Sequence, residues 1–461
     1  MSRALPEPFH REMSLRPHSN EFLAVLVFAV AIALAAIGMT RGTRAAVPNT
    51  VAQWDKIAED AVVRSGAFQN EGLIYMAYVS AAVYNAVVAI EGGYQPYGQG
   101  VSAPVGASTD AAVIEATYRS LVNYFPTQAP LLDPLYETAL AAILDGQLKT
   151  DGQWVGEAAA NLIITMRTSD ARMTPIGTTS PFPTRNPAPG VWRLTPPAFA
   201  APQTPWVGNV TPFVLQAADQ FLPDGPPSLL SGDWVEAFNE IKLRGSATNS
   251  ARTDAETATA LFWTANVIRQ YNQALRDVIN ANRLTLLESA RLQAMVNIVG
   301  ADAQIAVMNA KYHFLFWRPV TAVDPSAVKP APGDGFGPIP GYDDGNSMTL
   351  EQSGWRPLAA TPNHPEYPAA HGSITSAMAE VFRSFAETNH FNFVIHGFDP
   401  SGAPGNLNAV RTFNTPGKLR DEIIDARVWA GLHYRFSGVA GVVMGRQVAK
   451  YDLSHAFQRV Q

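Results

Sequence analysis

The chain has 461 residues, of which 47% are hydrophobic and only 16% charged, so it can bury a large core and is not generally disordered. A net charge of -6 argues against a sequence-independent nucleic-acid binder, which needs an excess of Lys and Arg. The absence of cysteine excludes disulfide scaffolds, thiolate metal sites and cysteine nucleophiles.

The first element is an uncharged apolar run over residues 22–39, which follows three arginines and precedes the small-x-small cleavage site Thr43-Arg44-Ala45. We interpret residues 1–46 as an export signal, so the protein is expected in the periplasm or outside the cell. Because the run could also span a bilayer as a helix of about 20 residues, an uncleaved membrane anchor is the alternative. Later hydrophobic segments are interrupted by charges, so we expect membrane contact only through this run.

Helical patterns fill most of the remaining chain, because apolar residues recur at spacings of three and four. They lie at residues 51–90, 108–123, 129–146, 151–168, 232–244, 253–281, 285–316, 372–388, 417–432 and 437–457. No strand-like alternation extends over several segments. We therefore predict an all-α fold, with one helical domain over residues 47–461 built from two bundle-like halves.

Residues 174–227 interrupt this pattern, because recurring prolines forbid long helices there. The segment carries Trp192, Phe199, Trp206 and Phe213, and such aromatic side chains would be costly to expose on a free linker. We therefore expect a long Pro-rich irregular segment that lies on the helical core.

The first candidate motif is KYHFLFWRP, in which Lys311 and Arg318 are seven residues, nearly two helical turns, apart. A helix that continues to Pro319 would place both cations on one face, about 10 Å apart along the axis, from where both could reach one small oxyanion. A solvated cationic edge is the alternative, although the intervening HFLFW is an unusual setting for solvated charges.

The second motif is HPEYPAAHGS, in which Pro368 fixes the chain before His371 and the following residues read as a helix. Free N–H groups at that helix start would bind an anion, which the small side chains allow to approach. His371 has a pKa suited to proton transfer near neutrality. A capped turn with a structural histidine is the alternative.

The third motif is DARVWAGLHYRFSG, in which Arg427 and His433 are six residues apart. A continuous helix would place them about 120° apart, so both meet one ligand only if the helix ends or bends near Gly431. A core histidine with a surface arginine is the alternative.

In this order, Lys-x6-Arg-Pro, Pro-x-x-His and Arg-x5-His resemble the signature of the superfamily of type 2 phosphatidic acid phosphatases and vanadium-dependent haloperoxidases. PGVWRLTPPAF, SARTDAETATALFW and GADAQIAVMNAKYHFLFWRPVTAV look like its bacterial haloperoxidase-like branch, so the resemblance covers most of residues 50–450. It implies that Lys311, Arg318 and Arg427 neutralise the oxygens of bound vanadate or phosphate, helped by backbone N–H groups near Ala370 and Gly372.

The resemblance also implies roles for three histidines. His433 would bind the vanadium, or would be the nucleophile of a phosphatase. His371 would be the general acid-base, and His364 would lie near the halide-oxidising pocket, where bromoperoxidases similarly carry a histidine.

The implied reaction is oxidation of bromide or chloride by hydrogen peroxide, with vanadate as the cofactor and Lewis acid, followed by halogenation of a small organic acceptor. Phosphate would compete, because trigonal-bipyramidal vanadate resembles the transition state of phosphoryl transfer. Two alternatives stay open. One is an acid phosphatase-type phosphomonoester hydrolase with His433 as nucleophile, and the other is a non-catalytic anion-binding or structural protein.

The sequence departs from the family pattern in two places. Ala369 and Ala370 replace the usual Ser-Gly, which removes one hydroxyl donor worth ~3 kcal/mol in an oxyanion site but keeps the backbone donors. Ser437 replaces the Asp that would orient His433, which compromises a phosphatase more than a vanadate binder. Asp425 or a carbonyl are the candidates for the missing partner.

Four further residues have both a structural and a functional interpretation. Glu366 and Asp302 could partner the arginines, with solvation on a helix face as the alternative. We interpret His390 and His396 as surface residues rather than metal ligands.

Overall fold

The computed structural model describes residues 49–172, 188–324, 344–389, 392–397 and 409–460. The interpreted export signal and residues 174–187 of the Pro-rich segment lie outside these ranges. The described helices and strands are α2 (Thr50–Arg64), α3 (Gln69–Glu91), α4 (Thr109–Tyr124), η1 (Pro126–Gln128), α5 (Ala129–Ala141), α6 (Gln147–Met166), η2 (Pro205–Asn209), α7 (Gly232–Arg244), α8 (Asp254–Phe262), α9 (Val267–Asn282), α10 (Leu286–Phe314), α11 (Pro319–Val323), α12 (Ala370–Phe385), β1 (Phe393–His396), β2 (Val410–Phe413), α13 (Pro416–Trp429) and α14 (Arg435–His455).

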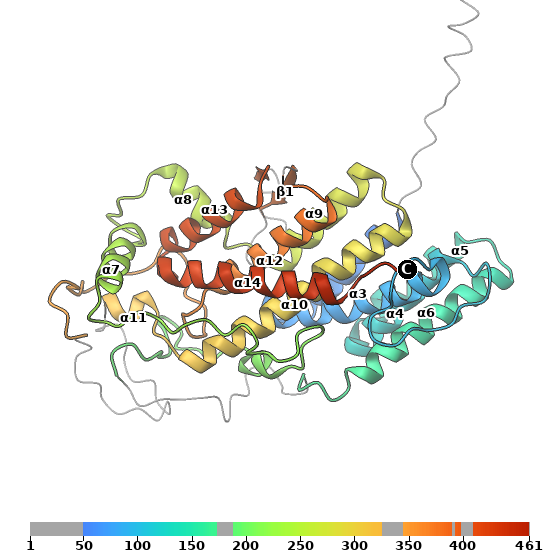
Figure 1. Cartoon of the computed structure of the whole chain (residues 1–461), viewed down its shortest axis with the longest axis horizontal. Coiled ribbons are helices and arrows are strands. Elements are labelled where there is room, and N and C mark those ends of the chain that lie inside the picture. The colour runs from blue at the N-terminus through green and yellow to red at the C-terminus, as the bar shows by residue number, and fades with distance from the viewer. Residues whose placement is uncertain (1–48, 173–187, 325–343, 390–391, 398–408, 461) are drawn as a thin grey trace, which may run out of the picture. The chain divides into compact units, whose positions relative to one another are not determined.

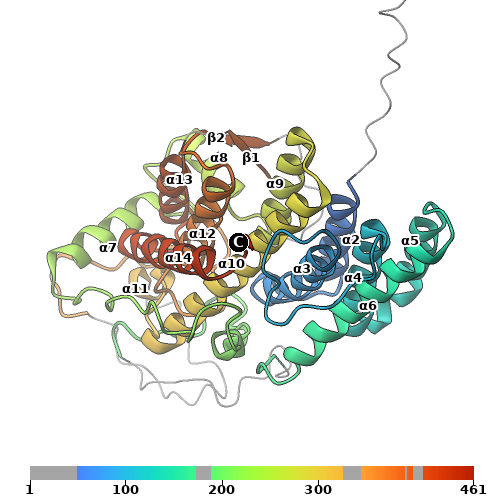
Figure 2. The ribbon, with the colours of Figure 1, turned by 45° about the vertical axis from the view of Figure 1, so that its right-hand side comes forward.

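Helix α10 is the element that the two bundle-like halves share. It begins at a capping box formed by Thr285 and Glu288, and nearly all of its 29 residues are buried or partly buried. On one side it packs against α3 of the N-terminal half, and on the other against α12 and α14 (Figures 1 and 2). The predicted all-α fold with two bundle-like halves is therefore confirmed.

Helix α3 lies in the core of the N-terminal half. Among the described residues, it alone has the length and apolar composition of a membrane-spanning helix, and 83% of that apolar window is buried inside the protein. Its apolar character therefore serves packing within the bundle.

One small sheet interrupts the helical fold. Strands β1 and β2 pair antiparallel, with Phe393 opposite Phe413, and β1 lies beside α9 (Figure 2). Phe393, Ile395 and Phe413 are buried at 0–4% exposure. The sequence analysis did not predict these strands, because four residues are too few to show a clear alternation.

The described part of the Pro-rich segment lies on the helical core, as predicted. Trp192, Trp206 and Phe213 are buried, and only the short η2 is helical. Asp302 of α10 fixes the segment, because its carboxylate accepts the N–H groups of Phe213, Val214 and Leu215 at 2.6, 2.7 and 3.1 Å. The expectation that Asp302 partners the arginines of the motifs, or is solvated, is therefore wrong.

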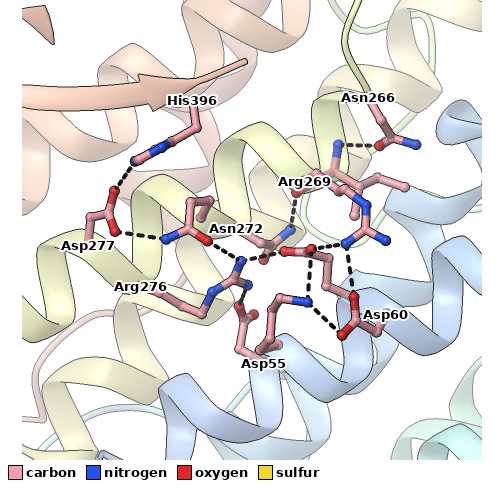
Figure 3. A network of polar contacts seen from close by, with 12 residues as sticks. Asp55, Asp60, Asn266, Arg269, Asn272, Arg276, Asp277 and His396 are labelled. Carbon is pink, nitrogen blue, oxygen red and sulfur yellow. Dashed lines mark hydrogen bonds and ion pairs between the residues drawn. The ribbon is translucent and has the colours of Figure 1, made fainter. Parts of the chain in front are cut away.

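A buried ionic network joins α2 to α9 (Figure 3). Arg276 binds Asp55 at 2.6 Å and Glu59 at 2.7 Å, and Arg269 binds Glu59 and Asp60 at 2.6 and 2.9 Å. Burial raises the pKa of the Asp55 and Glu59 carboxyls although Arg276 opposes the shift. The arginine therefore offsets a desolvation cost at this junction.

His396 of β1 contacts the same helix α9. Its Nε2 lies 2.8 Å from the Asp277 carboxylate, and the side chain is 25% exposed (Figure 3). The histidine thus anchors the small sheet to the bundle, while His390 lies outside the described residues.

Candidate oxyanion site

Helix α10 ends at Phe314, before it reaches Arg318. Leu315 adopts the left-handed conformation at φ 51°, and its carbonyl accepts the Trp192 N–H of the Pro-rich segment at 2.7 Å. Arg318 is extended, as expected of a residue before proline. The prediction that Lys311 and Arg318 share one face of a continuous helix is therefore wrong, because pairing with the Pro-rich segment replaces the last helical turn.

Both cations nevertheless reach the second motif, and both are fully buried. Lys311 Nζ donates to the carbonyls of Pro365 and Glu366 at 2.9 and 2.8 Å. Arg318 Nε donates to the His364 carbonyl at 2.9 Å, and its Nη1 to the Leu432 carbonyl at 3.0 Å. Carbonyls hold these side chains in place without neutralising their charge.

Glu366 is the partner of His433 that the sequence analysis missed. Its Oε1 lies 2.8 Å from His433 Nδ1 and also accepts the Tyr434 N–H at 3.0 Å. Arg318 Nη1 approaches the other ring nitrogen, Nε2, at 3.2 Å, and a guanidinium can only donate. His433 is therefore neutral, with its proton on Nδ1 and a lone pair on Nε2.

Glu366 thus supplies the carboxylate partner of His433 that the family pattern expects from an Asp at position 437. The Asp425 carboxylate binds Arg435 at 2.8 Å, so the expectation that Asp425 supports His433 is wrong. Glu366 is 0% exposed and is not solvated on a helix face. The only signal in the sequence was its place between the two histidines of the second motif.

The start of α12 presents free backbone donors. Its N-cap is Ala369, whose methyl side chain cannot accept a hydrogen bond from the N–H groups of the first turn. Within the described ranges, the N–H groups of Ala370, His371 and Gly372 have no hydrogen-bond partner. These are the groups expected to bind an anion.

Close packing of α12 against α14 fixes that first turn. A Cβ on Gly372 would lie 2.8 Å from the Gly438 carbonyl oxygen. Gly441 of α14 faces the Ala369 carbonyl so closely that a Cβ there would clash with it. Glycine is thus required on both helices for this approach.

In the third motif the helix ends near Gly431, which is the condition for Arg427 and His433 to reach one ligand. Helix α13 ends at Trp429, and Gly431 has φ +76°, which returns the chain so that Arg427 and His433 line the same cavity. Arg427 is buried, and its Nη1 donates to the Trp263 carbonyl at 3.0 Å. Its Nε has no partner among the described residues.

Residues of the second and third motifs line a cavity of about 90 Å³. Its lining includes five of the predicted site residues, namely His364, Ala370, His371, Arg427 and His433. Arg318 lies behind this lining but touches His433, and its Nη2 is 3.0 Å from His364 Nδ1. Lys311 and Gly372 do not line the cavity; Lys311 holds the loop that carries Glu366.

Amide side chains complete the lining and were not predicted from the sequence. They are Gln69, Asn70, Gln203 and Gln304. Gln304 is one heptad before Lys311 on α10, and its Nε2 is buried without a partner in the described part of the chain. Together with His371 Nε2 and Arg427 Nε, it is one of three buried polar atoms of the lining that no described group satisfies.

The electrostatics of the site favour an anion. Burial and the neighbouring cations hold the pKa of the imidazoles of His364, His371 and His433 well below 6.5. Burial lowers the pKa of Arg318 to about 10 and that of Arg427 to about 9. Both guanidiniums therefore stay charged at neutral pH.

The balance of charge is positive. Burial lowers the pKa of Lys311 well below its usual value, with Arg318 adding to the shift. Burial raises the pKa of Glu366, the carboxyl at this site, to about 7. Vanadate, which the resemblance implies, fits residues of this kind, because buried cations, free N–H groups and a neutral imidazole nitrogen suit an oxyanion.

Comparisons with known proteins find similarity in sequence and in fold. The family described as the VCPO second helical-bundle domain matches residues 291–461. The vanadium chloroperoxidase of Curvularia inaequalis is 25% identical over 296 residues, which are 52% of this chain and 47% of that protein. The match thus spans about half the length of that relative.

Two bacterial structures share the fold. A vanadium-dependent iodoperoxidase superposes with a TM-score of 0.72 at 20% identity, covering 90% of this chain and 97% of its own. The holo form of a vanadium-dependent chloroperoxidase gives 0.61 at 16% identity, covering 86% and 91%. The resemblance inferred from the motifs is therefore confirmed as a similarity: residues 291–461 match the second helical-bundle domain of that family, and most of the chain shares the fold of the two bacterial vanadium-dependent haloperoxidases.

Proposed function

We propose that the protein is a vanadate-dependent haloperoxidase that uses hydrogen peroxide to oxidise a halide. The observation that carries the proposal is the charge of the site. Arg427 lines the small cavity, Arg318 lies behind the lining and contacts His433, and both guanidiniums are buried, while the nearby carboxyl of Glu366 contacts His433. Such an excess of buried positive charge is costly unless an anion offsets it.

The side chains have distinct roles in this proposal. Glu366 keeps the proton of His433 on Nδ1 and leaves Nε2 as the atom that would bind the cofactor. Vanadate bound there would supply Lewis-acid activation of peroxide towards a halide. His371, neutral and unpaired at Nε2, can accept a proton from a peroxide that enters the cavity. His364 lines the same cavity, on the side of Arg318.

The test is reconstitution of the full chain with vanadate, followed by halogenation of a dimedone-type acceptor with peroxide and iodide, bromide or chloride. All three halides belong in the assay, because the structural relatives are named for iodide and for chloride. Activity should depend on vanadate and disappear in His433→Ala. The matched control His455→Ala, which removes an exposed histidine, should keep it. Without halogenation by the vanadate-loaded protein, the proposal is wrong.

One observation favours a second candidate, a phosphomonoester hydrolase. The His433–Glu366 pair supplies the carboxylate support that a nucleophilic histidine needs, which removes the main objection raised by Ser437. Hydrolysis of a phosphomonoester by the same preparation, without halogenation, would establish this function instead. Vanadate binding without either activity would indicate a non-catalytic anion-binding protein.

We also propose that the protein is exported, on the strength of the apolar run at residues 22–39. Fractionation of expressing bacteria should place the activity outside the cytoplasm. A mature N-terminus near residue 46 would distinguish a cleaved signal from a retained anchor.

A further inference from the structure

A second and larger cavity lies between α7 and α14. Its volume is about 710 Å³, and it shares no lining residue with the candidate oxyanion site. Cavities of this size suit a small organic ligand. The side chains around it have two contrasting characters, acidic on α7 and apolar on α14.

The acidic side chains follow one face of α7. Asp233, Glu236 and Glu240 are spaced by three and four residues, and Asp224 adds a fourth carboxylate from the preceding segment. Asp233 stands in the first turn, where the helix dipole favours it. Glu236 and Glu240 lie farther along, so helix stability does not account for them.

Arg435 is the one cation in the lining, and carboxylates already offset it. Its guanidinium binds Glu240 through two nitrogens, at 3.0 and 2.7 Å, and Asp425 at 2.8 Å. Asp224, Asp233 and Glu236 have no ion-pair partner among the described residues. The cavity therefore carries an uncompensated negative charge.

The apolar side chains follow one face of α14. Phe436, Val439 and Val443 are spaced by three and four residues, and both valines are 48% exposed. Two more aromatic rings line the cavity, Phe221 and Tyr367. The Tyr367 ring lies 6.1 Å from that of Phe436, and its hydroxyl donates to the Asp224 carbonyl, so this hydroxyl already has a partner.

We infer that this cavity binds an organic ammonium cation with an apolar body. Carboxylates attract the charged group, and the faces of aromatic rings attract ammonium through their quadrupole. The apolar body would cover the exposed valines of α14. A neutral ligand would leave the carboxylates without a partner, and an anion would be repelled.

Calorimetric titration of the full chain with benzyltrimethylammonium tests the inference, with benzyl alcohol and benzoate as the neutral and anionic comparisons. The ammonium should bind saturably and about tenfold more tightly than the alcohol, and benzoate should not bind. Equal affinity for the cation and the alcohol would overturn the inference.

Substitutions locate the binding. Glu236→Gln and Asp233→Asn should each weaken binding of the ammonium about three- to tenfold, and Val443→Arg should abolish it. The matched control Glu137→Gln, an exposed acid on α5, should change nothing. Melting temperatures of all variants verify that they fold. Unchanged binding in the Asp233 and Glu236 variants would show that the ligand binds elsewhere.

Another occupant would give a different result. If the protein forms a dimer that Val443→Arg dissociates, and no ammonium binds, the cavity is an interface between two copies and the inference is wrong.

Discussion

His433 and Glu366 are 67 residues apart in the chain, yet His433 Nδ1 lies 2.8 Å from Glu366 Oε1. This contact joins the second motif to the third and sets which ring nitrogen of His433 carries the proton. Because it orients the proposed vanadate ligand, loss of the carboxylate should weaken cofactor binding rather than unfold the protein.

We predict that Glu366→Gln lowers the affinity for vanadate about 10- to 100-fold, since glutamine accepts the Nδ1 proton without a negative charge. Equilibrium dialysis with vanadate measures the effect. Glu366→Asp should recover part of the affinity if charge is the cause. A Gln variant that binds vanadate as tightly as the parent protein would remove Glu366 from this role.

His371 should respond to an anion in the cavity. In the anion-free protein, burial and the charges of Arg427, Lys311 and Arg318 hold its pKa well below 6.5. A bound oxyanion cancels these charges, so the pKa should rise. NMR of histidine-labelled protein, titrated with and without sulfate, measures the change, and the signal of the exposed His455 is the control. An identical titration of His371 in both conditions would show that no anion binds beside it.

Asp452 makes stability depend on pH. It is 0% exposed, both carboxyl oxygens lack a partner in the described residues, and burial raises its pKa well above 3.8. Above pH 3.8 the unfolded state releases a proton that the folded state keeps. The free energy of unfolding therefore falls with rising pH, by about 1.4 kcal/mol per unit, until the folded-state pKa is reached.

Asp452→Asn should consequently stabilise the protein more at pH 8 than at pH 5. Urea denaturation of both proteins at the two pH values measures the difference. The same comparison with Asp145→Asn, at a side chain that is 96% exposed, provides the control. An equal effect of Asp452→Asn at both pH values would mean that the Asp452 carboxyl does not titrate differently in the folded state.

Arg276 offsets two buried carboxylates, those of Asp55 and Glu59 (Figure 3). Arg276→Leu leaves both without their main cation and should lower the free energy of unfolding by about 3–5 kcal/mol. Lys56→Leu removes a half-exposed cation from the same network and should cost at most about 1 kcal/mol. Urea denaturation compares the two, and similar losses would contradict the importance of burial here.

Local sequence patterns predicted most of the helices, because helix periodicity and capping involve only a few neighbouring residues. The three motifs were also identified from the spacing of nearby residues. These patterns did not predict that α10 ends at Phe314, because this end requires a positive φ at Leu315, which a leucine rarely adopts. That break depends on pairing with Trp192, more than a hundred residues earlier. The role of Glu366 was missed for the same reason, since its partner His433 is distant in the chain.

Gly441 shows that a residue outside the cavity lining affects the position of the backbone N–H groups at the start of α12. Gly441 does not line the cavity, but a Cβ on it would meet the carbonyl of Ala369, the N-cap of α12. A single added methyl group would push that carbonyl away and tilt the three free N–H groups behind it. We therefore expect a larger side chain at position 441 to weaken anion binding, although every charged residue of the candidate site would remain in place.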